Sequence, residues 1–190
     1  MQHTWQQRNA PAGRIEEARA LGATPLQARI LAGRLPEPTT DLRHTLFPRD
    51  HVLRWEELPD IRPAAARIAD AIQRREVIAA CVDHDADGVT SCLVIRESLV
   101  KHFGVDPALV HSVCSHRTRE GYGVSSKLVE RVLALSPRPT LVITADQGSA
   151  DEDRIRVLRD EHQIETVVSD HHAIPLAGVP RSAVACVNPA

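Results

Sequence analysis

The sequence predicts an α/β fold, with a mostly parallel sheet of about five strands that has helices on both faces. Apolar, partly β-branched segments recur along the second half of the chain, and helical patterns separate them. Continuous apolar runs are typical of parallel strands, which are buried on both faces and need a helical crossover between them. The 190 residues and the 43% hydrophobic content suffice for one domain with a core and a small appendage.

Residues 1–60 are predicted to form a small helical N-terminal segment followed by a linker. One amphipathic helix is expected over residues 14–21, where a glycine follows it. A second is expected over residues 24–33, because a threonine followed by a proline is a typical helix start and a glycine a typical end. The prolines and weak periodicity of residues 36–59 indicate short turns.

Residues 61–190 are predicted to form the α/β domain itself. It should open with a helix over residues 63–75 that places Ile68 and Ile72 on one face. The strands are expected at residues 77–82, 109–114, 140–145, 165–169 and 183–187. Helical patterns follow the first strand and the cap residue Ser125. We also expect Ser149-Ala150-Asp151-Glu152 to act as a capping box for the helix before the fourth strand.

Three of the predicted strands end in side chains that can bind a metal. The first is followed by Asp83-His84-Asp85-Ala86-Asp87, the third by Asp146 and the fourth by Asp170-His171-His172. The carboxyl ends of parallel strands meet at one edge of the sheet, so these residues can converge. Ionised carboxylates this close repel one another unless a cation lies among them. Carboxylates mixed with imidazoles favour manganese or magnesium over zinc.

The segment from Asp83 to Gly88 also resembles a calcium-binding loop and a phosphatase nucleophile motif. A calcium-binding EF-hand loop would need a glutamate at its twelfth position, where this chain has Val94, and it would follow a helix rather than a strand. We therefore reject it. The nucleophile motif of haloacid-dehalogenase-type phosphatases also follows a strand, but that family usually adds a paired-aspartate motif and a lysine. It remains a distant alternative.

Composition limits the classes of partner and location. A net charge of −2 and an aromatic content of 3% weigh against a complete nucleic-acid-binding protein, though not against its catalytic part. The four cysteines form no Cys-x-x-Cys pair, which argues against a zinc knuckle. We find no signal-peptide pattern and no membrane-spanning apolar run, so we expect a cytoplasmic protein with no membrane partner.

The three strand-end motifs resemble the first three motifs of the DHH phosphoesterase superfamily, from Asp83 to Gly88, Asp146 to Gly148 and Asp170 to His172. Residues 117–123 and Val187-Asn188-Pro189 are similar to its bacterial RecJ branch, the 5′-to-3′ exonucleases specific for single-stranded DNA. The resemblance departs from the usual pattern at His84, where the family often has tyrosine or phenylalanine.

The resemblance implies a role for each matching residue. The implied metal ligands are Asp85, Asp87, Asp146 and His171, with Asp146 bridging two Mn²⁺ or Mg²⁺ ions. Asp83 and His172 are the implied catalytic residues, with Asp83 ligating or orienting and His172 facing the scissile phosphate. Arg117 and Tyr122 would lie on the substrate side with His172. Two alternatives remain open: Arg117 as a solvated surface charge, and Tyr122 as a simple turn residue.

The implied activity is metal-dependent cleavage of single-stranded DNA from its 5′ end, in repair and recombination, with other repair proteins as further partners. Two alternatives stay open: a phosphodiesterase for short oligonucleotides or cyclic dinucleotides, and a non-catalytic scaffold that binds a repair or replication partner. The superfamily normally supplies a fourth aspartate motif and a DHH-associated domain later in the chain. We therefore expect an incomplete fragment with little activity alone.

Overall fold

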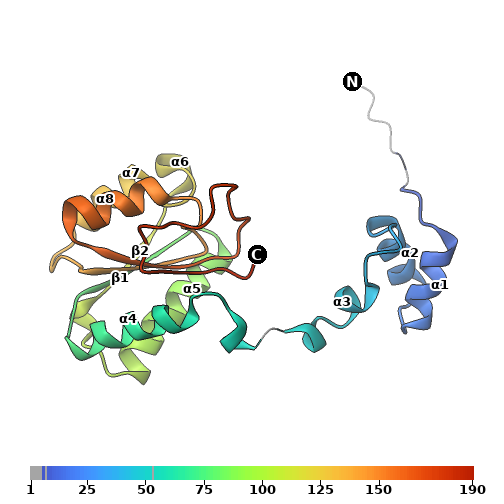
Figure 1. Cartoon of the computed structure of the whole chain (residues 1–190), viewed down its shortest axis with the longest axis horizontal. Coiled ribbons are helices and arrows are strands. Elements are labelled where there is room, and N and C mark those ends of the chain that lie inside the picture. Colours follow the sequence, from blue (N-terminus) through green and yellow to red (C-terminus); the bar gives the residue numbers. More distant parts are fainter. Residues whose placement is uncertain (1–5, 7, 53) are drawn as a thin grey trace. The chain divides into compact units, whose positions relative to one another are not determined.

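The computed structural model describes residues 6, 8–52 and 54–190, and the chain divides into two compact units, Met1–Leu53 and Arg54–Ala190 (Figure 1). The first unit contains α1 (Ala12–Ala20), α2 (Pro25–Arg34), α3 (Leu42–Leu46) and a 3₁₀ turn (Pro48–His51). The helices α1 and α2 pack through small side chains, and Leu42 of α3 is fully buried in the same cluster. This unit falls within the stretch 1–60 that is predicted to be a helical segment and linker.

Local chemistry explains where α2 begins. The Thr24 hydroxyl accepts a hydrogen bond from the Gln27 amide, and the Gln27 side chain accepts one from the Thr24 amide at 2.9 Å, so the two residues form a capping box. The predicted start is confirmed. The predicted end is one residue early, because Gly33 lies inside the helix and Arg34 is its last residue. The short helix α3 was not expected in a stretch predicted to contain turns.

The second unit is built on a five-stranded sheet in which every neighbouring pair is parallel, in the order β2-β1-β3-β4-β5. The strands are β1 (Ile78–Val82), β2 (Val110–Cys114), β3 (Leu141–Ala145), β4 (Glu165–Ser169) and β5 (Ala185–Val187). Their last residues are in register, so all five strands end at one edge. The predicted fold class is confirmed.

Helices cover both faces of this sheet (Figure 1). The helices α4 (Ile61–Gln73) and α5 (Ala86–Glu97) lie on one face, and α7 (Ser126–Leu133) and α8 (Glu152–His162) lie on the other. Shorter elements complete the unit: 3₁₀ turns at Trp55–Glu57 and Pro107–Leu109, a π turn at Ser98–His102 and helix α6 (Arg117–Glu120).

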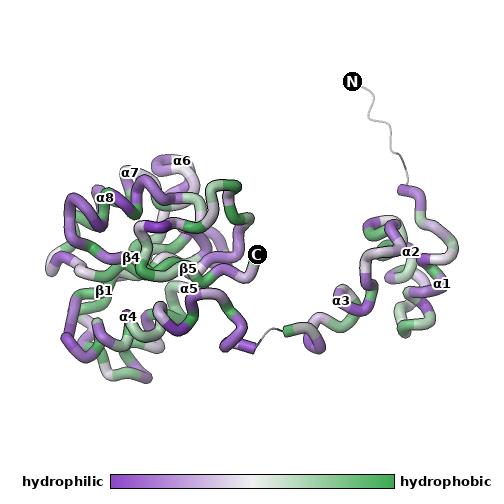
Figure 2. Tube along the Cα trace, viewed as in Figure 1, coloured by the Kyte–Doolittle hydropathy of each residue, from purple (hydrophilic) through white to green (hydrophobic). Residues whose placement is uncertain are grey.

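Along β1, Ile78 packs with the first layer and Ala79 with the second, as alternation in a strand requires. The hydropathy colouring shows the strands as hydrophobic (Figure 2).

The strand order creates one place suited to a ligand. The chain leaves β1 toward β2 on one side and later adds β3 on the other side of β1. Where the order reverses in this way, the loops after the two strands diverge and leave a crevice at their carboxyl ends. That crevice lies between the ends of β1 and β3, where Asp83 and Asp146 follow the strands.

Of the two helix caps predicted in the second unit, the cap of α7 forms and the cap of α8 does not. Ser125 caps α7, since its hydroxyl accepts a hydrogen bond from the Leu128 amide at 3.1 Å, as predicted. The capping box predicted for α8 is wrong: α8 begins at Glu152, and its carboxylate instead binds Ser182. The Ser149 hydroxyl accepts from Asn188 and does not cap the helix. The Glu152 carboxylate and the Ser149 hydroxyl therefore both bind residues that are distant in the sequence. Within the part of the chain that the structure describes, no helix is long and apolar enough to cross a membrane.

Candidate metal centre and active site

Two overlapping groups of potential metal ligands lie at the carboxyl edge of the sheet. Asp83, Asp85 and Asp146 form one group, and Asp146, His171 and His172 form the other. Within each group the candidate ligand atoms lie within 4.8 Å of one another. Since Asp146 belongs to both, its carboxylate is placed where it could bridge two ions.

The end of β1 is held in place by a close backbone approach. A Cβ atom at Gly88 would lie 2.3 Å from the carbonyl oxygen of Asp83, so only glycine allows the first turn of α5 to pack there. Asp83 is buried, and its Oδ1 accepts hydrogen bonds from the Ser115 hydroxyl and the His84 amide, both at 2.8 Å. Burial opposes ionisation of Asp83, but these hydrogen bonds outweigh it and its pKa is lowered. Asp83 is thus a fixed carboxylate.

The backbone of Asp146 is strained, with φ at 60°, a conformation that residues other than glycine adopt rarely. Its amide donates to the carbonyl of Ser169 at 3.0 Å, and its Oδ1 lies 2.9 Å from His171 Nε2. Burial, followed by the negative charges of Asp87 and Asp85, raises the pKa of Asp146, although the hydrogen bond with His171 lowers it. Such a cluster of carboxylates would be stabilised by a cation.

Asp170 organises the histidine pair. Its Oδ1 accepts hydrogen bonds from His172 Nδ1 at 2.8 Å and from the amides of both histidines, and its Oδ2 accepts from the Ser149 amide. Burial raises the pKa of Asp170, but the hydrogen bonds more than offset this effect and the pKa is lowered. The hydrogen bond that His172 donates to Asp170 in turn raises the pKa of His172. Nδ1 of His172 is therefore engaged in the hydrogen bond with Asp170, and Nε2 is the ring nitrogen that can contact a metal or a phosphate.

The two three-ligand groups overlap only in part with the ligand set that the resemblance implies. Asp83 and His172 belong to three-ligand groups, whereas Asp87, an implied ligand, belongs to neither group. The Asp87 carboxylate is nevertheless adjacent, since its Oδ2 lies 3.7 Å from His171 Nε2. Its pKa is lowered by its hydrogen bond with Asp85 and by the charge of His171. One cluster therefore contains all six residues: Asp83, Asp85, Asp87, Asp146, His171 and His172.

Arg117 and Tyr122 stand together beside this cluster. The Arg117 guanidinium lies 4.5 Å from the centre of the Tyr122 ring, and its Nη2 lies 3.9 Å from Asp85 Oδ2. The Tyr122 side chain is 70% exposed, which leaves its ring available to a ligand. Arg117 and Tyr122 are therefore held together at the edge of the cluster by a cation–π contact.

The loop that carries Tyr122 is fixed to the start of α8. Gly123 has φ at 69°, and a Cβ atom there would lie 2.7 Å from Asp151 Oδ2. The amide of Val124 donates to the same oxygen at 2.9 Å. Tyr122, Asp83, Asp146, Asp170 and His172 line one cavity of about 260 Å³. The loop and the candidate ligands therefore face a common space.

Most of the second unit matches a known protein family. Residues 77–190 match the DHH family, N-terminal domain. The chain belongs to the DHH family. The single-stranded-DNA-specific exonuclease RecJ of Thermus thermophilus is 36% identical over 141 residues, which cover 72% of this chain and 20% of that protein. RecJ of Bacillus subtilis is 31% identical over 153 residues, covering 80% and 19%. The chain thus spans about a fifth of these relatives' length.

Solved structures agree with this DHH assignment. A crystal structure of exonuclease RecJ bound to manganese has a TM-score of 0.61 and 31% identity, covering 73% of this chain and 33% of that chain. RecJ from Thermus thermophilus in complex with Mn²⁺ has a TM-score of 0.56 and 26% identity, covering 94% and 24%. The resemblance to the DHH superfamily and its RecJ branch is confirmed.

The donor set of this DHH domain fits a manganese or magnesium ion. It offers hard carboxylate oxygens and imidazole nitrogens, and no described cysteine belongs to either ligand group. After burial, the negative charges of Asp87 and Asp85 raise the pKa of Asp146, and a cation among these carboxylates would offset that repulsion. Zinc, which prefers thiolate and imidazole ligands in closed sites, fits less well.

Sequence reasoning did not predict the roles of three residues that hold the DHH site together, although Asp170 and Asn188 belong to motifs that it named. Asp170 orients His172, and Ser115 orients Asp83. Asn188 follows β5 and is buried, and its amide donates to the Ser149 hydroxyl at 2.8 Å and the His172 carbonyl at 2.9 Å. For Asp170 and Asn188 the signal was available, because each directly follows a predicted strand at the same edge of the sheet. Nothing in the local sequence distinguishes Ser115.

Proposed function

We propose that this DHH domain hydrolyses phosphodiester bonds with two divalent ions, and that its substrate is single-stranded DNA attacked from the 5′ end during repair or recombination. The observation that carries the proposal is the sharing of Asp146 by two three-ligand groups. Two-metal sites place ions about 3.5–4 Å apart. A carboxylate common to both groups is the feature such a site requires.

In this proposal Asp85, Asp87, Asp146 and His171 hold the ions, and Asp83 completes or orients the first group. Bound ions would supply Lewis-acid chemistry, activating water and stabilising charge on the attacking and leaving oxygens. The hydrogen bonds to Asp83 keep it ionised and in position. The strained backbone at Asp146 is typical of a residue whose placement is needed for function.

His172 and Arg117 are proposed to contact the scissile phosphate. Asp170 fixes the ring of His172 and raises its pKa, which favours a protonated imidazole that can donate from Nε2 to a phosphate oxygen. Arg117 adds a second positive charge on the same side, and Tyr122 offers an exposed ring on which a base can stack.

The choice of substrate is supported by the names of the relatives, which are single-stranded-DNA-specific exonucleases. The segment 117–123 and Asn188, which resemble the RecJ branch, lie at the cluster in the structure. A phosphodiesterase for short oligonucleotides is the second candidate, because the metal cluster alone would serve either substrate. The two candidates differ in how the rate depends on strand length.

Two measurements test this function. Calorimetric titration of the chain with Mn²⁺ should detect two sites, and Asp146→Asn should weaken both. Since the chain alone is expected to have little activity, long incubation of excess chain with Mn²⁺ and a 3′-labelled single strand should shorten only a small part of the strand from its 5′ end, and EDTA should stop the reaction. Faster cleavage of dinucleotides than of long strands would favour the second candidate, and Mn²⁺ binding that Asp146→Asn leaves unchanged would contradict the proposed centre.

A further inference from the structure

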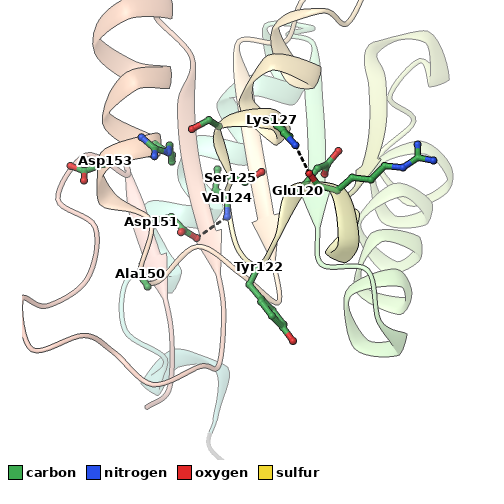
Figure 3. Close-up of a pocket in the computed structure, with 11 residues that line it drawn as sticks. Glu120, Tyr122, Val124, Ser125, Lys127, Ala150, Asp151 and Asp153 are labelled. Atoms are coloured by element: carbon green, nitrogen blue, oxygen red, sulfur yellow. Dashed lines mark hydrogen bonds between the residues drawn. The ribbon is translucent and has the colours of Figure 1, made fainter.

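A second cavity, of about 510 Å³, shares lining residues with the cavity of the candidate active site. Figure 3 shows the residues that line it. The cavity opens between the first turn of α7 and the first turn of α8. Three basic residues line it: Arg119, Lys127 and Arg154. All three are exposed, and the Lys127 ammonium donates to the Arg119 carbonyl at 2.6 Å, which holds the ammonium at the cavity. The cavity is therefore built from elements of the α/β domain.

The positive charges of this cavity are not neutralised inside the protein. Within residues 6, 8–52 and 54–190, none of the three basic side chains forms an ion pair. Two of the carboxylates that line the cavity are already paired, Glu120 with Arg131 at 2.9 Å and Asp153 with Arg156 at 3.0 Å. The local balance is thus positive, although the net charge of the chain is −2.

The third acidic residue of the cavity, Asp151, serves the loop rather than the basic residues. Its carboxylate accepts a hydrogen bond from the Val124 amide at 2.9 Å, the interaction drawn as a dashed line in Figure 3. Burial also raises the pKa of Asp151. Its carboxylate accepts from the backbone and also interacts with the charge of Arg154, which lowers its pKa, so it offsets that charge only in part. Arg119 and Lys127 form no ion pair among the described residues.

The cavity continues from the candidate active site. Tyr122, Ala150 and Asp151 line both this cavity and the 260 Å³ cavity that contains Asp83, Asp146 and His172. Tyr122 therefore forms part of the boundary between them. A strand whose scissile phosphate lay at the metal cluster would pass Tyr122 to reach the basic residues.

We infer that this cavity is a second phosphate subsite, which binds a neighbouring phosphate of the same single strand whose scissile phosphate lies at the metal cluster. The inference rests on the proposed function for its ligand. Lysine and arginine are the usual partners of backbone phosphates, and such contacts do not depend on base identity. The subsite would hold the strand without contributing to the cleavage step.

The test measures strand binding in EDTA, so that no bound ion contributes to the binding. Fluorescence anisotropy of a labelled oligothymidylate is recorded at several salt concentrations for the whole chain and for Lys127→Ala/Arg154→Ala. The matched control is Arg74→Ala/Lys101→Ala, which removes the same charge from the opposite edge of the sheet, where α4 and the π turn end. Circular dichroism checks that each variant is folded.

We expect the subsite variant to bind several-fold more weakly. Its salt slope should fall by about 0.7 for each phosphate of the single strand that the variant no longer neutralises. Competition separates the sources of phosphate: inorganic phosphate should compete far less well than an oligonucleotide. Equal weakening by the control variant, or no binding by the unmodified chain, would overturn the inference. If the unmodified chain bound the strand through Lys127 but showed no cleavage with Mn²⁺, only the proposed function would be contradicted.

Discussion

His172 Nδ1 lies 2.8 Å from Oδ1 of Asp170, and the same carboxylate oxygen accepts the backbone amides of both histidines. One buried carboxylate therefore sets the ring orientation of His172 and the path of the chain after β4. Such partners behind a metal ligand or catalytic histidine orient it and tune its basicity. Removing the acceptor should therefore disturb the site without removing any candidate ligand.

Asp170→Asn should lower cleavage by about 10–100-fold, because the amide can no longer accept every hydrogen bond that orients His172. The measurement is the rate of Mn²⁺-dependent cleavage, with the affinity for Mn²⁺ determined in parallel. Asp160→Asn, an exposed aspartate on α8, is the control and should change neither quantity. An unchanged rate in Asp170→Asn would show that the orientation of His172 does not matter.

Gly88→Ala should destabilise the domain by about 1–3 kcal/mol, the usual cost of forcing a methyl group into a packed site. The new Cβ atom would lie 2.3 Å from the Asp83 carbonyl, so the first turn of α5 must shift. Urea unfolding measures the effect. Gly13→Ala on α1 meets no atom within 4 Å and should be neutral or slightly stabilising.

Gly123→Ala should weaken strand binding more than it weakens Mn²⁺ binding. The Cβ atom would lie 2.7 Å from Asp151 Oδ2, so either the Asp151 side chain gives up its hydrogen bond with the Val124 amide or the loop carrying Tyr122 shifts. Gly178→Ala is the matched control, because φ is also positive there, at 90°, but no atom lies within 4 Å. Comparing the Kd for a single strand in the two variants isolates the clash from the backbone strain. Equal effects would rule the clash out.

Mn²⁺ should raise the melting temperature, since a ligand that binds only the folded state stabilises it. At a concentration one hundred times the Kd, a single site contributes about 2.7 kcal/mol. The rise should disappear with EDTA and be much smaller in Asp146→Asn. A matched control, Asp106→Asn, changes an exposed aspartate in the turn before β2 and should keep the full rise. An equal rise in Asp146→Asn would place the ion elsewhere.

Acid should weaken the ion-pair network of Arg67, Glu76 and Glu165. Arg67 lies 2.6 Å from Glu76 and 2.5 Å from Glu165, and the Thr140 hydroxyl donates to Glu76. Burial opposes ionisation of Glu76, but these hydrogen bonds outweigh it and its pKa is lowered. A lowered carboxyl pKa stabilises the fold above the unfolded pKa. That stability is lost as the pH falls through the folded value.

Glu76→Gln should therefore cost about 1.5–3 kcal/mol of unfolding free energy at neutral pH, and the difference from the unmodified chain should shrink below pH 4 or so. Glu97→Gln, whose partner is the exposed Lys101, is the control and should cost less than about 0.5 kcal/mol. Urea unfolding across the pH range gives both curves. A difference that does not depend on pH would contradict the role of the Glu76 charge.

The strands and the candidate ligands could be predicted because both depend on local or repeating features. The run before Asp83 is apolar throughout, and the residues of β1 are all buried, which is what a central parallel strand requires. Asp83, Asp146 and His171 follow three such strands, and parallel strands end together. The α5 helix shows the limit, since its apolar residues Leu93 and Val94 are 56% and 65% exposed.

The sequence by itself determined the α/β class, the strand positions and the residues that gather at the carboxyl edge. Only the tertiary structure decided how those residues are used: Ser149 binds Asn188 instead of capping α8, and Asp170 fixes His172. The reason is physical. Periodic burial is a property of each segment, whereas a buried polar group takes its hydrogen-bond partner from whichever distant segment the fold brings beside it.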